Sequence, residues 1–72
     1  MLISTYLDDG RVFEYEVSTE MKAREHSAAI VKYGYRHNDG KEFEHYGPHR
    51  ILKVKVTGGP VSTMYPDSTR GT

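Results

Sequence analysis

One segment, residues 18–34, is the only stretch of this sequence with a helical repeat, and sequence typical of β-strands flanks it on both sides. Small and apolar side chains recur in it at steps of three and four residues, which places them on one narrow stripe of a helix. The stripe consists of Ala23, Ser27, Ile30, Val31 and Gly34. Because these side chains are mostly small, we expect the helix to lie close against a sheet.

Both ends of this helix carry recognisable signals. Ser18 is the expected N-cap, and Glu20 follows in the first turn, where the helix dipole favours a negative charge. Lys32 lies in the last turn, and Gly34 is placed to adopt the left-handed conformation that ends many helices. We therefore predict a helix between these residues.

Two β-rich segments, residues 2–7 and 11–17, precede the helix, and a turn sequence ending in Gly10 lies between them. A two-residue turn would place Ile3 opposite Glu16, which is a poor match. A three-residue loop with Gly10 in its left-handed position instead gives a register in which apolar side chains face one another. The predicted pairs are Leu7 with Arg11, Thr5 with Phe13, and Ile3 with Tyr15.

The same loop sequence recurs after the helix, where Asn38 and Asp39 precede Gly40. An identical three-residue loop pairs His37 with Lys41 and Tyr35 with Phe43. The sequence therefore predicts a second hairpin over residues 35–46 with aromatic side chains on one face.

Residues 49–56 alternate between two kinds of side chain and predict the clearest strand of the chain. One side consists of Arg50, Leu52, Val54 and Val56, and the other of Ile51, Lys53 and Lys55. From residue 58 onward the period is lost and glycine, proline and hydroxyl residues dominate. We expect one domain over residues 1–57 and a mobile tail over residues 58–72, lightly held by Val61, Met64 or Tyr65.

These elements follow one another in the order β-β-α-β-β-β. The simplest arrangement is an α+β fold of two layers, an antiparallel sheet with one helix packed on one face. A β-grasp arrangement is the alternative, and it requires the first and last strands to pair in parallel. The residues expected between helix and sheet are Ile3, Phe13, Tyr15, Val17, Ala23, Ser27, Ile30, Tyr35, Phe43, Leu52, Val54 and Val56.

The composition limits the setting in which the chain works. It has 72 residues and no cysteine, so neither a disulfide nor a thiolate zinc site stabilises its small core. No apolar run approaches the roughly 20 residues of a membrane span. We expect a cytoplasmic protein without a membrane partner.

The net charge is zero, but the charges are unevenly distributed along the chain. Residues 1–20 contain five acidic residues and one arginine, whereas residues 21–56 contain eight basic and four acidic residues. Such a distribution serves solvation, attraction between strands of the fold, or recognition of an acidic partner.

Nothing in the sequence indicates catalysis or a cofactor. The serines lie in no nucleophile-elbow motif, the glycines form no phosphate-binding loop, and the aspartates are explained by turns. Four histidines (His26, His37, His45 and His49) could suggest zinc, but they lack the spacing of a metal site, so surface histidines are the better interpretation. We predict a protein that is not an enzyme and has no metal site.

Binding through a surface is the function that remains. Tyrosine and arginine are enriched at the energetic centres of protein interfaces, and this chain has six tyrosines. The candidate binding residues are Arg36, Lys41, Tyr46, His49, Lys53 and Lys55. A protein partner is the first hypothesis. Binding of nucleic acid by the last three strands is the alternative, since phosphates need basic groups and bases stack on aromatic rings.

The small size and the element order over residues 12–56, with no cysteine and no catalytic motif, resemble the accessory proteins of phages and other mobile elements. Some of these, including the anti-CRISPR inhibitors, block host defence complexes by surface binding, and the resemblance implies a function of that kind.

Self-association is also expected. The small core leaves a monomer marginally stable, and the second face of the sheet carries acidic Glu14 and Glu16 together with basic Lys53 and Lys55. A symmetric homodimer, formed through an edge strand or through this face, would bring these charges of opposite sign together.

Overall fold

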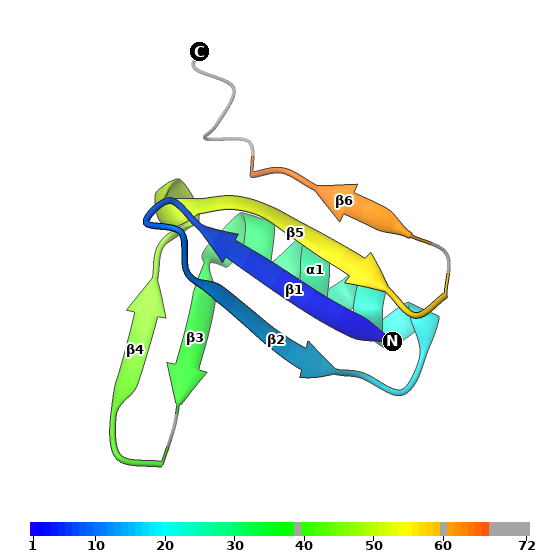
Figure 1. Ribbon diagram of the computed structural model, residues 1–72, viewed down its shortest axis with the longest axis horizontal. Coiled ribbons are helices and arrows are strands. Elements are labelled where there is room, and N and C mark those ends of the chain that lie inside the picture. Colours follow the sequence, from blue (N-terminus) through cyan, green and yellow to red (C-terminus); the bar gives the residue numbers. More distant parts are fainter. Residues whose placement is uncertain (39, 60, 67–72) are drawn as a thin grey trace.

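The computed structural model describes residues 1–38, 40–59 and 61–66, which form two antiparallel sheets and one α-helix (Figure 1). The larger sheet has the strand order β2-β1-β5-β6, and α1 packs across one of its faces. The smaller sheet is the hairpin β3-β4, which projects beside the β2 edge of the larger one. The elements are β1 (Leu2–Leu7), β2 (Val12–Glu16), α1 (Glu20–Tyr33), β3 (Tyr35–Asn38), β4 (Phe43–Tyr46), the 3₁₀ turn η1 (Pro48–Arg50), β5 (Ile51–Thr57) and β6 (Ser62–Met64).

This arrangement confirms the predicted α+β class and its element order. It excludes the β-grasp alternative, because β1 and β5 lie side by side at the centre of the sheet but run antiparallel. The helix α1 has 14 residues, and no helix of the described residues is long and apolar enough to cross a membrane.

The first hairpin has the predicted register. Ile3 lies opposite Tyr15 and Thr5 opposite Phe13. The three-residue loop is closed by the amide of Leu7, which donates to the carbonyl of Arg11 at 2.9 Å. Gly10 takes φ of 93°, a conformation that costs glycine little and other residues much.

The helix begins one residue later than predicted. Thr19, rather than Ser18, is the N-cap, and its hydroxyl accepts a hydrogen bond from the amide of Lys22 at 3.1 Å. The predicted stripe faces the sheet, with Ala23, Ser27 and Ile30 buried. At the other end Gly34 has φ of 103°, and a side chain at this position would collide with the carbonyl oxygen of Tyr46. The glycine therefore lets β3 leave the helix close to the end of β4.

The predicted register of the second hairpin is wrong. Tyr35 lies opposite Tyr46, and Asn38 lies opposite Phe43, so the loop between the strands is one residue longer than predicted. The partner of Tyr35 moves by three residues, an odd number, and this exchanges the two faces of β4. Tyr46 is consequently buried, whereas Phe43 is 62% exposed and does not belong to the core. The observed register is favoured because it buries two rings, those of Tyr35 and Tyr46, against Phe13.

A register shift interrupts the pairing of β1 with β5. Tyr6 lies opposite Lys53 but Leu7 lies opposite Ile51, so Leu52 is the extra residue of a β-bulge. The bulge turns Ile51 into the core, whereas Leu52 is 52% exposed. The predicted assignment of these two side chains to the faces of β5 is therefore wrong, although Val54 and Val56 are buried as predicted.

The larger sheet extends past Thr57, the predicted end of the domain. β6 pairs with β5 so that Val54 lies opposite Met64, and Pro66 is buried beyond it. The pattern of residues 58–66 did not predict this strand. The remaining part of the predicted tail, residues 67–72, lies outside the described residues.

Candidate functional site

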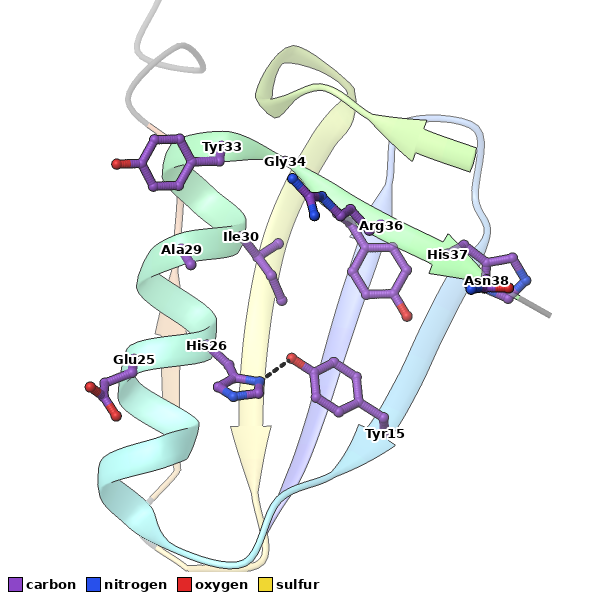
Figure 2. Close-up of a pocket in the computed structure, with 11 residues that line it drawn as sticks. Tyr15, Glu25, His26, Ala29, Ile30, Tyr33, Gly34, Arg36, His37 and Asn38 are labelled. Carbon is purple, nitrogen blue, oxygen red and sulfur yellow. Dashed lines mark hydrogen bonds between the residues drawn. The ribbon is translucent and has the colours of Figure 1, made fainter. Parts of the chain in front are cut away.

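A groove of about 950 Å³ separates α1 from β3, and the side chain of Tyr15 on β2 reaches into it from below (Figure 2). It is larger than a second hollow, of about 240 Å³, beside Met1 and Met64. Its lining consists of Tyr15 from β2, Glu25, His26, Ala29, Ile30 and Tyr33 from α1, Gly34, and Tyr35, Arg36, His37 and Asn38 from β3.

The edge of β3 forms one wall of the groove. All four consecutive residues of β3 line it, whereas no residue of β4 does. Successive side chains of a strand point to opposite faces, so a wall made by consecutive residues is the edge of the strand rather than a face. β3 pairs with β4 along its other edge and, within the described residues, has no second strand beside it. The wall is therefore an edge at which no second strand of the described residues pairs with β3.

Tyr15 and His26 connect the floor of the groove to the helical wall. The hydroxyl of Tyr15 and Nδ1 of His26 form a hydrogen bond of 2.8 Å, and the two ring centroids lie 5.7 Å apart (Figure 2). Partial burial, and secondarily the neighbouring Tyr35, raise the pKa of the Tyr15 hydroxyl. It therefore stays protonated at neutral pH and can donate a hydrogen bond.

A stack of rings holds β3 in place beside β2. The ring of Phe13 stacks on those of Tyr35 at 5.2 Å, His37 at 4.6 Å and Tyr46 at 5.8 Å between centroids. Burial raises the pKa of the Tyr35 hydroxyl. Three side chains of the β3-β4 hairpin thus pack on Phe13 and hold β3, one wall of the groove, against β2.

The helical wall is more exposed than the floor. The small side chain of Ala29 lies at the centre of this wall and is exposed. Tyr33, which is 63% exposed, lies at the C-terminal end of α1. The Nζ atom of Lys32 lies 5.2 Å from the centre of the Tyr33 ring. Nε2 of His45 lies 3.0 Å from the carbonyl oxygen of Tyr33 and ties the end of α1 to β4.

The predicted binding residues do not form one surface. Arg36 lines the groove, and Lys41 lies in the loop between β3 and β4. His49 belongs to η1. Lys53 and Lys55 lie on β5, on the face of the larger sheet that α1 does not cover.

Tyr46 is buried rather than available to a partner. It is 6% exposed, and its hydroxyl accepts a hydrogen bond from Nη1 of Arg11 at 2.9 Å. The guanidinium of Arg11 also lies 4.9 Å from the ring centre. Tyr46 thus joins the two hairpins, and substitutions of it report on the fold.

The histidines do not converge. His37 lies opposite Glu44 and His45 opposite Arg36, so these two histidines point to opposite faces of the β3-β4 hairpin. His26 is engaged with Tyr15. Over residues 1–38, 40–59 and 61–66 no group of three potential ligands is close enough to hold a metal ion.

The sequence pattern did not single out the groove. Glu25 and Ala29 of its helical wall lie outside the stripe that was expected to face the sheet, and Tyr15 was expected only to pack in the core. One signal does point to it: Tyr15 and Tyr35 are aromatic residues on strands flanking the helix, yet the small-residue stripe leaves no wide side chain on α1 to cover them. The groups that meet in the groove are ring faces, hydroxyls, a guanidinium and a strand edge, which are suited to binding.

Comparison with protein-family models found no match, and searches of curated proteins and of solved structures found none either. The fold and the groove alone define the class of this chain, which is a small α+β domain with a groove between a helix and a strand edge.

Proposed function

We propose that this protein is a non-catalytic binding module that holds an extended segment of a partner protein in the groove between α1 and β3. The observation that carries the proposal is that β3 lines the groove along its edge, with all four of its residues. An extended peptide can add to such an edge through backbone hydrogen bonds, and pockets beside the edge then select its side chains.

The helical wall opposite the strand edge supports this mode of binding. Ala29 and Ile30 give the centre of the groove an apolar wall, and Tyr15 gives it an apolar floor with a hydroxyl. A peptide strand directs alternate side chains to opposite faces, so every second side chain would enter this space. An apolar or aromatic side chain fits it best.

Arg36 and Tyr33 supply the groups that recognise a protein. Both are exposed, and both line the groove. Arginine and tyrosine are the side chains that most often dominate the binding energy of protein interfaces. Of the residues proposed from the sequence, Arg36 is the one that keeps this role.

Binding of nucleic acid receives less support from the arrangement of charges. A phosphate backbone needs a continuous basic track. Here Arg36 and Lys41 belong to the hairpin, whereas Lys53 and Lys55 lie on another face. Glu14 lies on that same face, which weakens the attraction of the two lysines for phosphate.

We propose further that the partner is a protein of a host defence complex and that the module blocks it in the cytoplasm by occupying a surface. This part of the proposal is supported by the resemblance to mobile-element accessory proteins and by the absence of cysteine. It identifies the kind of partner to be tried first.

Selection from a random peptide display library tests the groove. Enriched peptides should protect from hydrogen exchange those backbone amides of residues 35–38 that point away from β4, because strand addition engages that edge. Ala29→Arg, which places a long side chain into the groove, should weaken binding by about tenfold or more.

Ala28→Arg is the matched control, since Ala28 is also exposed on α1 but does not line the groove. It should leave the affinity within about twofold of the wild-type value. Equal loss in the two variants, or protection confined to another element, would exclude the groove as the binding site.

A further inference from the structure

The face of the larger sheet that α1 does not cover is turned toward the viewer in Figure 1. Two contacts identify side chains that share it. The hydroxyl of Ser4 donates to Oε2 of Glu14 at 2.9 Å, and Nζ of Lys53 lies 4.9 Å from the ring centre of Tyr6. Alternation along the strands adds further members to this open face, which comprises Leu2, Ser4, Tyr6, Val12, Glu14, Glu16, Lys53 and Lys55.

Charge is separated by strand on the open face. The acidic residues Glu14 and Glu16 belong to β2, the basic residues Lys53 and Lys55 belong to β5, and β1 lies between the two strands. The register places Glu14, Ser4 and Lys55 in one row across the sheet.

The opposite charges of the open face form no ion pair with each other within one molecule. Two strand spacings separate β2 from β5, which is about 10 Å. None of the ion pairs in the described part of the chain includes Glu14, Lys53 or Lys55. The row therefore presents a negative end and a positive end to whatever covers it.

The centre of the row is suited to contact rather than to solvation. Ser4 is only 4% exposed, and Leu2 and Tyr6 beside it on β1 are half-buried. Leu2 and Tyr6 add apolar surface between the two charged strands, and Val12 adds more on β2 opposite Tyr6. A covering layer would thus meet apolar side chains at the middle and opposite charges at the sides.

We infer that a second copy of this chain covers the open face, with a two-fold axis parallel to β1. Rotation about that axis keeps each residue at the same position along the strand direction. It brings β2 of one copy over β5 of the other. It places Glu14 over the partner's Lys55 and Lys55 over the partner's Glu14, with Ser4 facing its own copy. A two-fold axis perpendicular to the strands would place acidic β2 over its own copy, which like charges oppose.

The geometry of packed sheets permits these contacts. Two sheets pack face to face about 10 Å apart with their strands within about 30° of each other, and long side chains from both sides span the space. An isologous contact of this kind satisfies both ends of the row in both copies at once.

Dimerisation through the open face goes beyond the groove and leaves it accessible. The groove lies on the α1 side of the sheet, as does Tyr15 at its floor. The dimer therefore presents two grooves on its outer surfaces. Ala29→Arg should not change the dimer dissociation constant, so failure of either proposal is recognised independently of the other.

Sedimentation equilibrium over a concentration series tests the inference. The wild-type chain, of 8.2 kDa, should form a species of twice that mass, and added salt should weaken it. Glu14→Lys and Lys55→Glu should each raise the dissociation constant about tenfold or more. An equimolar mixture of the two variants should recover dimers, because each variant then meets the opposite charge.

Lys32→Glu is the matched control, because it makes the same change of charge on the exposed side of α1. It should leave dimerisation unchanged. A chain that stays monomeric into the millimolar range, a mixture without recovery, or equal weakening by Lys32→Glu would each overturn the inference. If a charge reversal unfolds the chain, Glu14→Gln and Lys55→Gln provide the same test, and unchanged dissociation constants for both would overturn it.

Discussion

Arg11 and Tyr46 join the two hairpins of this fold, although 35 positions separate them in the chain. Nη1 of Arg11 donates to the Tyr46 hydroxyl at 2.9 Å, and the guanidinium lies over the ring at 4.9 Å from its centre. Arg50 approaches the same ring at 5.8 Å and forms an ion pair with Asp8 at 2.8 Å. The loop of the first hairpin, η1 and the end of β4 are thus held together around one buried ring.

The first prediction concerns the register of the second hairpin. Tyr46→Ala should reduce the free energy of unfolding by about 3 kcal/mol, because it empties a buried ring site between Phe13 and Arg11. Phe43→Ala should change it by less than about 0.5 kcal/mol, because that ring is exposed. Urea denaturation followed by circular dichroism measures both values. The reverse ranking would restore the register in which Phe43 lies opposite Tyr35.

The second prediction concerns acid stability. Side-chain hydrogen bonding from Arg11 holds the pKa of Asp9 below its ordinary value of 3.8. A group whose pKa is lower in the folded state stabilises the fold above its unfolded pKa, and this contribution is lost as the pH falls through the folded pKa. The urea midpoint of wild type should therefore exceed that of Asp9→Asn above about pH 5, and the difference should shrink below about pH 4.

Arg11→Met provides the control for this pH dependence, since it removes the principal cause of the shift. In that background, Asp9→Asn should change the urea midpoint less, and the change should vary less with pH. A midpoint difference that persists unchanged to the lowest pH would show that Asp9 acts through its turn geometry alone, where its Oδ1 accepts from the amide of Arg11 at 3.0 Å.

The parts of the fold that local sequence specifies were predictable. The first hairpin follows from a three-residue loop with Gly10 at its end, because only one short loop aligned its apolar residues. The helix follows from the stripe at Ala23, Ser27 and Ile30. In both cases the decisive information lies within about ten residues.

The second hairpin was mispredicted because its register is decided by a distant residue. Residues 38–41 allow several loops, and the ring that selects among them is Phe13, on β2. Leu52 was mispredicted for a similar reason. The bulge arises directly after η1, where Ile51 lies opposite Leu7. The sequence of β5 alone alternates without interruption and therefore gives no sign of the bulge.

The candidate groove was less predictable than the fold, since it is a space between α1 and β3. Arg36 was proposed from its charge and does line it. Tyr15 and His26 lie 11 positions apart, and nothing local indicates that they form a hydrogen bond. A groove between two elements can be predicted only when the placement of these elements relative to each other is known.

The last prediction concerns the contact between α1 and the sheet. Ser27 is fully buried, and within the described residues its hydroxyl has no hydrogen-bond partner. A buried polar group without a partner costs free energy, so Ser27→Ala should leave the free energy of unfolding unchanged or raise it by about 1 kcal/mol. Ala23→Leu, on the same stripe, should lower it by about 1–3 kcal/mol, because the added atoms have no space between helix and sheet.

Lys32→Ala, on the exposed side of α1, is the reference for both substitutions and should stay within about 0.5 kcal/mol of wild type. Thermal and urea unfolding of the three variants give the comparison. A clear loss of stability in Ser27→Ala would show that its hydroxyl is hydrogen-bonded in solution. Equal effects of Ala23→Leu and Lys32→Ala would mean that a different face of the helix meets the sheet.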